Sequence, residues 1–281
     1  RRPYPVEAAL NWQYQEDISE TIVAPAGNLE LSGDLNNLTL SHQLSGPAAL
    51  DSSGTIDLGL ASFLNAESDN ITPALDLTHT LSPMTVPGAV QLTINSFTLN
   101  TQGTPDDLGL NANASITATI NDELSIQSDI RTQAFLRGSY LDIDTLALAT
   151  DSGQVLIDGR VDWSDAVSIN ANYSIEDSAP GSYLALEDSG IVLANLASRG
   201  QVGLIMPAGG DMNLSLQVPE ISVVVNDRTI AGSSELAFDG SRWQLSQFQL
   251  NSDESHIDVQ AEMNSDQTIQ AASVINIPNL S

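Results

Sequence analysis

The side chains that most often carry acid–base or metal chemistry are few and scattered in this sequence. His42, His79 and His256 are the only histidines, cysteine is absent, and no two histidines have the close spacing of a zinc site. Glycine motifs that cradle phosphates or expose a nucleophile are also missing. The acidic pair Asp106 and Asp107 lacks the spacing of a calcium loop, so solvated charge explains it better. The sequence therefore predicts no enzyme, no metal site and no cofactor.

The charge balance excludes two classes of partner. Acidic residues number 36 and basic residues 8, which gives a net charge of -28 at pH 7. Such a surface repels the phosphates of nucleic acids and the headgroups of anionic lipids. No apolar run is long enough to span a membrane, and the opening residues RRPYPVEAAL lack the apolar core of a signal peptide. We expect the chain to be a segment of a longer protein.

Alternation of apolar and polar residues dominates the chain and predicts the elements that position every side chain. The stretch 142–175, DIDTLALATDSGQVLIDGRVDWSDAVSINANYSI, alternates almost without interruption. A period of two is typical of a strand with one buried and one wet face. Turn signals such as SGD, NN and SSG break similar runs at spacings of roughly 8–12 residues, which predicts about 20 strands.

Two stretches lack clean alternation. A short helix is expected at Leu193–Ser198, and residues 59–66 are a weaker helical candidate. The segment DSAPGS, which ends just before Tyr183, predicts a connector. We therefore place a soft boundary near 177–183, between residues 1–181 and 182–281, with the second part continuing the same kind of sheet.

An internal repeat supports an extended sheet. Aligning Leu148 with Leu250 requires no gap as far as Ile175 and Ile277. The repeated unit is an apolar pair, a polar loop and then a strand with a small residue in mid-face. Repetition of this kind favours an elongated sheet over a closed globule.

Two longer stretches carry a family resemblance. GNLELSGDLNNLTL at 27–40 and GSRWQLSQFQLNSDESHIDVQAEMN at 240–264 share a glycine, apolar-x-Leu pairs, a short polar loop and an alternating strand. With the ending INIPNL at 275–280, this pattern resembles the periplasmic part of the TamB family, inner-membrane-anchored subunits of the translocation and assembly module within the AsmA-like superfamily of bridge-like lipid carriers. The resemblance extends over most of the chain. The family's membrane helix and the portion that meets its outer-membrane barrel partner are expected to lie outside this segment.

The resemblance implies both a fold and a function. The expected fold is all-β, an elongated and largely antiparallel sheet bent into a U (a β-taco), with an apolar concave groove and at most two short helices. The expected function is a periplasmic conduit for phospholipid acyl chains between the two membranes of a Gram-negative bacterium, which supports outer-membrane biogenesis. Its partners are phospholipids and, through other parts of the protein, the outer-membrane barrel subunit. An alternative is a chaperone that binds the strands of outer-membrane barrels or autotransporters by strand addition.

Period two assigns the positions that line such a groove, and the aliphatic character of its walls suits sliding chains better than one defined ligand. The residues expected to line it are Leu108, Leu110, Ile116, Val155, Ile157, Val161, Val167, Ile169, Ala171, Tyr173, Ile221, Val223, Ile257, Val259 and Met263. The polar neighbours of these residues should point outward. The rival interpretation of the same alternation is the closed core of a β-sandwich, a barrel or an adhesin-like protein. Open terminal strands would also favour self-association of the segment.

Two further residues are expected to be structural. His79 is in phase with Leu77 and Leu81, so it should lie on the apolar face as a histidine whose ring nitrogens are hydrogen-bonded. Trp243 stands at the start of an expected strand and should pack there rather than contact a ligand.

Overall fold

The computed structural model describes residues 5–14, 24–34, 36–46, 48–60, 71–88, 90–120, 124–183, 190–253, 255–266 and 268–278. Contacts divide the chain into two units, residues 1–138 and 139–281, which are described separately. Strands make up more than half of the chain, and η1 (Pro180–Tyr183) is the only helical element that lies wholly within the described ranges.

The first unit is an antiparallel sheet in which neighbouring strands follow one another along the chain. The one exception is β6, which pairs with one end of β7 while β5 pairs with the other end. Its strands are β1 (Pro5–Gln13), β2 (Ala26–Asp34), β3 (Asn37–Ser45), β4 (Leu50–Asp57), β5 (Ala74–Leu81), β6 (Met84–Val86), β7 (Val90–Thr104), β8 (Asp107–Ile120) and β9 (Leu124–Arg137).

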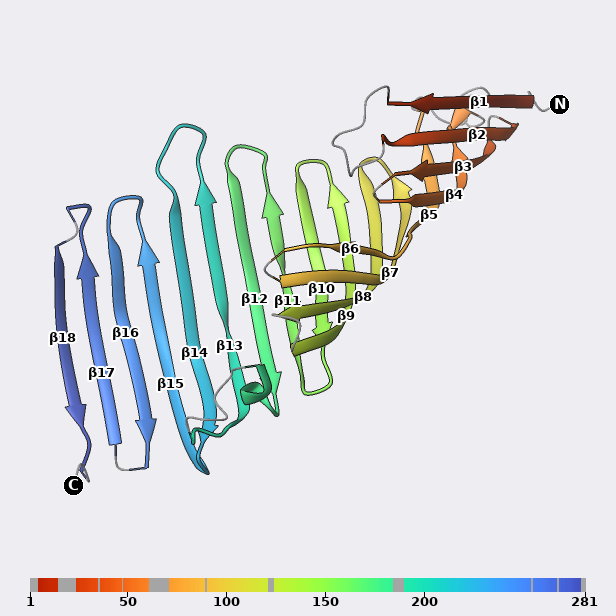
Figure 1. Ribbon diagram of the computed structural model, residues 1–281. Coiled ribbons are helices and arrows are strands. Elements are labelled where there is room, and N and C mark those ends of the chain that lie inside the picture. Colours follow the sequence, from red (N-terminus) through yellow and green to blue (C-terminus); the bar gives the residue numbers. More distant parts are fainter. Residues whose placement is uncertain are drawn as a thin grey trace. The chain divides into compact units, whose positions relative to one another are not determined.

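The second unit is an uninterrupted antiparallel meander, drawn from green to blue in Figure 1. Each strand pairs with the strands before and after it in sequence. Its strands are β10 (Tyr140–Ala149), β11 (Gly153–Asp162), β12 (Val167–Asp177), β13 (Leu193–Met206), β14 (Asn213–Val225), β15 (Arg228–Phe238), β16 (Trp243–Ser252), β17 (Ser255–Met263) and β18 (Ile269–Asn276).

The predicted all-β, antiparallel fold is confirmed, and the sheets are open. Among the described strands, no pairing joins β1 to β9 or β10 to β18, so neither unit closes into a barrel. Open antiparallel sheets with one apolar face are consistent with the trough of a β-taco and not with a closed sandwich.

The helix expected at Leu193–Ser198 is wrong, because these residues begin β13. The pairing of β13 with β14 shifts between Ala194 and Ala197, and Asn195 there has a φ of 50°. This β-bulge inserts an extra residue, so Leu193 and Leu196 acquire the three-residue spacing of a helix while remaining in a strand. Most of the weaker candidate at 59–66 lies outside the described residues.

The internal repeat seen in the sequence corresponds to equivalent strands. β10, β11 and β12 align with β16, β17 and β18, and both copies carry a bulge at the same place. The register shifts between Ile143 and Leu146 in the first copy and between Leu245 and Phe248 in the second. The boundary near 177–183 falls at η1, between β12 and β13, and stays a prediction.

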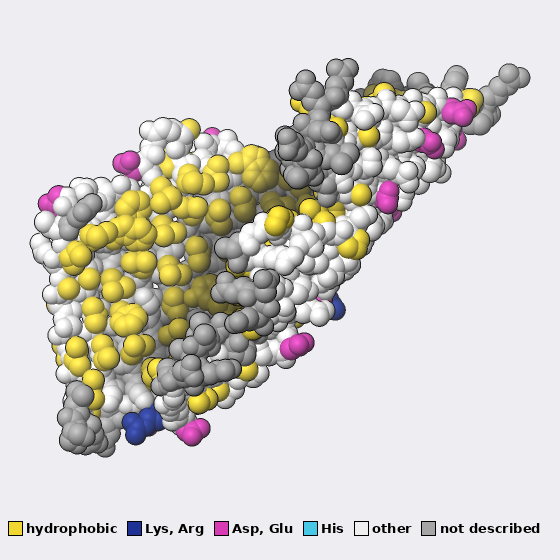
Figure 2. All heavy atoms as spheres, in the orientation of Figure 1, with side chains coloured by type: hydrophobic (Ala, Val, Ile, Leu, Met, Phe, Trp, Pro, Cys, Tyr) yellow, Lys and Arg dark blue, Asp and Glu magenta, His cyan; other side chains and the backbone are white. Residues whose placement is uncertain are grey.

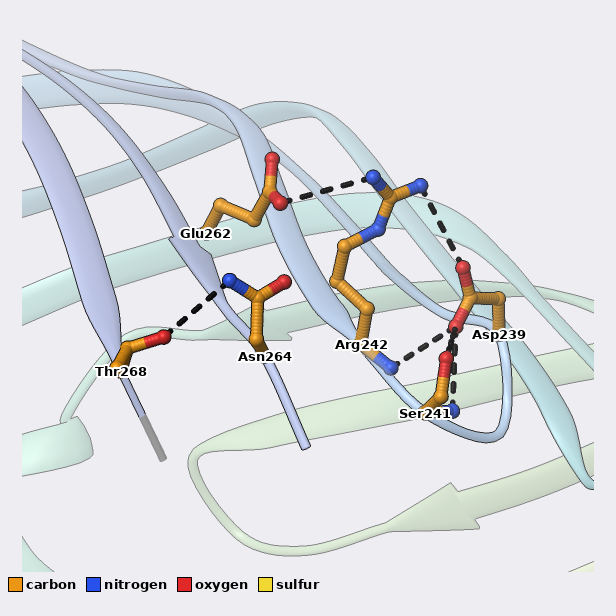
Figure 3. Close-up of polar contacts among 6 residues, drawn as sticks. All are labelled: Asp239, Ser241, Arg242, Glu262, Asn264 and Thr268. Atoms are coloured by element: carbon orange, nitrogen blue, oxygen red, sulfur yellow. Dashed lines mark hydrogen bonds and ion pairs between the residues drawn. The ribbon is translucent and has the colours of Figure 1, made fainter. Parts of the chain in front are cut away.

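Aspartate-capped turns close several hairpins of the second unit. In the β15–β16 turn, one carboxylate oxygen of Asp239 accepts hydrogen bonds from the amide and hydroxyl of Ser241 and from the amide of Arg242, at 3.2, 2.9 and 2.9 Å (Figure 3). The Arg242 guanidinium bridges Asp239 and Glu262 at 3.4 and 3.6 Å. The hydrogen bonds from Ser241 are the main cause that lowers the pKa of Asp239.

The same device recurs in two other turns at this end of the unit. Asp162 accepts from the amide and hydroxyl of Ser164 at 2.8 and 2.7 Å, and Asp266 accepts from the amide and hydroxyl of Thr268 at 2.9 and 2.6 Å. These bonds favour the ionised carboxylate, so they lower the pKa of both aspartates. Side chains that bond to their own turn fix where each strand ends and the next begins.

These carboxylates predict a loss of stability in acid. A carboxylate whose folded-state pKa is lowered stabilises the fold above its ordinary value of 3.8, and that stabilisation is lost as the pH falls through the folded-state pKa. We expect the triple variant Asp162→Asn, Asp239→Asn, Asp266→Asn to fold, since an amide oxygen still accepts the turn bonds, and to show a flatter dependence of Tm on pH below about 4.

The control removes three charges of the same sign from positions without such bonds. The triple variant Asp165→Asn, Asp227→Asn, Asp253→Asn should show the same steep fall of Tm at acid pH as the unsubstituted protein, in thermal melts recorded by circular dichroism. If Tm depends on pH in the same way in the two triple variants, then net charge, and not the turn bonds, governs the loss of stability in acid.

Candidate functional site

Strand registers in the second unit gather apolar side chains on one face. Directly paired residues of antiparallel strands share a face, so a row can be followed from strand to strand. One row crosses all nine strands without a polar residue. It consists of Leu141, Val161, Ile169, Leu204, Leu214, Phe238, Trp243, Met263 and Ile269.

A second apolar row runs beside the first. Its members on β10 and β13–β16 are larger aliphatic residues, and those on β11, β12, β17 and β18 are small. Because no member is polar, the two rows together form an apolar strip. This row consists of Ile143, Gly159, Ala171, Val202, Leu216, Leu236, Leu245, Ala261 and Ala271. We call these two rows the apolar strip.

The registers bring together the residues that the sequence assigned to a groove. The twelve in the second unit, from Val155 to Met263, all lie on the face that carries the apolar strip. Leu108, Leu110 and Ile116 share one face of β8 in the first unit. Their shared placement is structural, whereas their role in lining a lipid groove stays a prediction.

Several members of the apolar strip were missed from the sequence. Leu204, Leu214 and Phe238 were not assigned to the groove, and Trp243 was expected only to pack at a strand start. The rings of Phe238 and Trp243 do pack, with centroids 4.7 Å apart, and both lie in the first row. The hairpin turns could have identified these residues. Counting residues outward from a turn shows which residue of one strand pairs with a strip residue of the next strand, and paired residues share a face.

The apolar face is open. Among the described residues only four apolar side chains are buried, and no large side chain is fully buried. Strip residues remain accessible: Ile269 is 68% exposed, and Trp243 and Leu245 are only partly covered. Figure 2 shows hydrophobic side chains spread over the strands of the second unit, with charged side chains at the margins. A closed β-sandwich core of this size would bury far more apolar side chains.

Charge is segregated to the opposite face of the same strands. Arg160 on β11 forms an ion pair with Asp142 at 2.5 Å, and its guanidinium lies 4.3 Å from the Tyr140 ring centroid. The hydrogen bond to Asp142 is the largest cause that raises the pKa of Arg160. Asn172 donates to Asp158 at 2.8 Å. Period two thus separates an apolar face from a hydrated one, as expected for the polar neighbours of the groove positions.

Three hydrogen-bonded polar side chains lie side by side on the apolar face of the first unit. His79 on β5 lies with its Nδ1 2.8 Å from the Ser52 hydroxyl and its Nε2 3.3 Å from the Thr101 hydroxyl. Ser52 and Thr101 are both buried residues, at 6% and 8% exposure. His79 is therefore a hydrogen-bonded structural histidine, as the sequence indicated.

Two other kinds of functional feature are absent from the residues that the structure describes. They contain no group of three or more His, Cys, Asp or Glu side chains placed to hold a metal ion. They also contain no helix with the length and hydropathy needed to cross a membrane.

Comparison with known families gives a match over the whole length. The family model described as TamB, N-terminal domain, covers residues 1–281. The chain belongs to the TamB family. Membership in the TamB family confirms the resemblance carried by residues 27–40 and 240–264, and it assigns the chain to a family of bacterial envelope proteins. Neither the curated proteins nor the solved structures contain a match to the chain.

The chain of hydrogen bonds at His79 predicts a coupled loss of stability. His79→Leu leaves the buried Ser52 hydroxyl without its partner, which should lower the free energy of unfolding by about 1–3 kcal/mol. Adding Ser52→Ala to His79→Leu should recover much of that loss, since the unpaired Ser52 hydroxyl is gone and the Thr101 hydroxyl still donates to the Leu77 carbonyl oxygen, 3.5 Å away. Chemical denaturation of the single and double variants measures the coupling. Additive losses would mean that the two side chains do not depend on one another.

Proposed function

We propose that this protein carries phospholipid acyl chains along its apolar face. The observation that carries the proposal is the apolar strip, in which two adjacent rows cross nine strands without a charged residue. An apolar surface of that extent, left open in a protein of net charge -28, needs an apolar occupant.

The dimensions of the strip suit an acyl chain. Eight intervals of about 4.8 Å between nine strands give a strip roughly 38 Å long. One acyl chain spans about half of a 30 Å bilayer core, or roughly 15 Å. Two chains can therefore lie end to end across the strands, with their apolar length against the strip.

The chemistry of the strip suits movement rather than tight binding of one ligand. Its members are mainly Leu, Ile, Val and Ala, which offer similar contacts at each step. A site for one defined ligand instead presents a few convergent polar groups. A lipid that shifts by one strand exchanges one set of aliphatic contacts for an equivalent set, so the barrier to sliding is low.

Family membership supports the setting of this proposal. As a TamB-family segment, the chain would work in the periplasm of a Gram-negative bacterium as part of an inner-membrane-anchored protein. Parts of the protein outside this segment would contact the outer-membrane barrel subunit of the same module. Lipid delivered along the strip would support outer-membrane biogenesis.

Charges placed on the apolar face, either within the apolar strip (Leu245) or beside it (Ile157), test the proposal. Ile157→Arg and Leu245→Arg each put a cation on the apolar face. A charge in lipid costs about 2.5–3.5 kcal/mol on insertion scales, which corresponds to roughly a hundredfold slower passage. In the full-length protein we expect both variants to fail to complement a strain that lacks the protein and its redundant relatives.

The matched control lies one residue away. Gln244 is exposed on the opposite face and pairs with Glu262, so Gln244→Arg adds the same cation without touching the strip. It should complement fully, and photo-crosslinkers should capture lipid at position 245 but not at 244. Equal crosslinking at both positions, or equal tolerance of both cations, would contradict the conduit.

A second candidate function rests on β18. All eight of its residues are exposed, including Val274 at 64% and Ile275 at 62%. An exposed apolar strand is a template for pairing with another chain. This favours strand addition, either to an outer-membrane protein segment, as a chaperone would bind it, or to a second copy of the chain.

Extraction and self-association measurements separate the two candidates. Phospholipid recovered by organic extraction of the purified protein, and lost in Leu245→Arg, supports the conduit. For strand addition, Val274→Lys should reduce self-association in sedimentation experiments, because a lysine on an edge strand opposes pairing. Gln244→Lys, which makes the same charge change on an interior strand, should leave self-association unchanged. If both variants behave alike, β18 is not the pairing edge.

A further inference from the structure

A ladder of amide and carboxylate side chains crosses the face opposite the apolar strip. Six directly paired residues on six consecutive strands, β11 to β16, carry it. They are Asp158, Asn172, Gln201, Gln217, Glu235 and Gln247. We call this row the polar ladder. Polar residues are expected on a wet face, but an unbroken row of planar amide and carboxylate groups is a specific chemical surface.

The polar ladder lines a hollow in the sheet. All six members border a concavity of about 860 Å³, whose lining also includes Leu156 and Pro219. The pairing of β14 shifts on both sides around Pro219, and the pairing of β16 shifts beside Gln247. Bulges bend strands and re-aim side chains, and they are frequent beside binding sites. The hollow is therefore built by the backbone and not by loose side chains.

The centre of the polar ladder keeps its hydrogen-bonding capacity. At its ends, Asn172 donates to Asp158 and Gln247 donates to Ser233, both at 2.8 Å. The three central members, Gln201, Gln217 and Glu235, form no side-chain hydrogen bond within the described part of the chain, and all three are exposed. Together they offer amide donors and carbonyl or carboxylate acceptors in one line.

The charges around the hollow select against ionic ligands. The ladder itself has two carboxylates and no cation. Arg199 also lines the hollow, but its ion pair with Glu220 offsets its charge, so the surroundings are net negative. An anionic polymer would be repelled, and a peptide would find few unpaired backbone groups on a sheet face. An uncharged ligand rich in hydroxyl and amide groups matches the donors and acceptors present.

We propose that the polar ladder binds an uncharged glycan strand lying across β11–β16. Strands repeat at about 4.8 Å, and an extended, β-linked pyranose chain advances by a similar distance per ring. Each ring would face one rung, with its hydroxyl or acetamido groups bonded to an amide or carboxylate. The rings nearest β11 and β14 would also place an apolar face against Leu156 and Pro219. The proposal concerns the face opposite the apolar strip, so it is independent of lipid transport.

Titration with defined oligosaccharides tests the glycan site. Chitotetraose and cellotetraose, both β-linked, should give saturable shifts in NMR spectra of the protein, whereas α-linked maltotetraose, whose chain coils, should bind at least tenfold more weakly. Gln201→Ala with Gln217→Ala should weaken binding at least tenfold, and the exposed Gln270→Ala on β18 should leave it unchanged. Glu235→Gln should retain binding, since an amide still pairs with hydroxyls.

Defined outcomes overturn the proposal. These are no saturable binding of either β-linked tetramer, equal binding of maltotetraose, or binding that survives the double alanine variant while circular dichroism shows an intact sheet. Preference for an anionic oligomer such as a heparin fragment would also overturn it. Leu245→Arg should not alter glycan binding, so failure of the lipid conduit and failure of the glycan site are read separately.

Discussion

Register between neighbouring strands is the constraint on which the molecule depends. A slip of one residue in any hairpin of the second unit would move apolar side chains to the wet face of every strand beyond it. The aspartates that cap turns hold the ends of the hairpins. Asp162, Asp239 and Asp266 each fix the residue at which one strand stops and the next begins. The register therefore decides which side chains lie on each face of the sheet.

β-bulges keep the apolar side chains of a long strand on the same face of the sheet. On β14 the apolar face is carried by Leu216 and Val218 before the bulge and by Ile221 and Val223 after it. The inserted residue re-phases the sequence, so apolar residues on both halves point the same way. The same change of phase occurs between Leu245 and Phe248 on β16, beside the member of the polar ladder on that strand. One backbone feature thus preserves the apolar strip and shapes the hollow on the other face.

An open sheet whose two faces differ this sharply has an unusual energetic basis. Little apolar surface is buried in a shared core, so cross-strand pairing and hydrogen-bonded ladders carry more of the stability than in a sandwich. Where a polar side chain lies on the apolar face, it is hydrogen-bonded: His79 bonds to the hydroxyls of Ser52 and Thr101. The uncovered apolar strip is the part of the structure that an acyl chain would complete.

Sequence alone determined the fold class, the alternation of faces and the repeat that relates β10–β12 to β16–β18, because side-chain direction in a strand follows directly from residue order. It also placed Val155, Ile157 and Val161 on one face of their strand. It failed where a bulge changed the phase, since the spacing of Leu193 and Leu196 mimics a helix. Only the tertiary structure decided which strands are neighbours and in what register. The apolar strip and the polar ladder are cross-strand rows, assembled from residues far apart in sequence, so no local pattern specifies them.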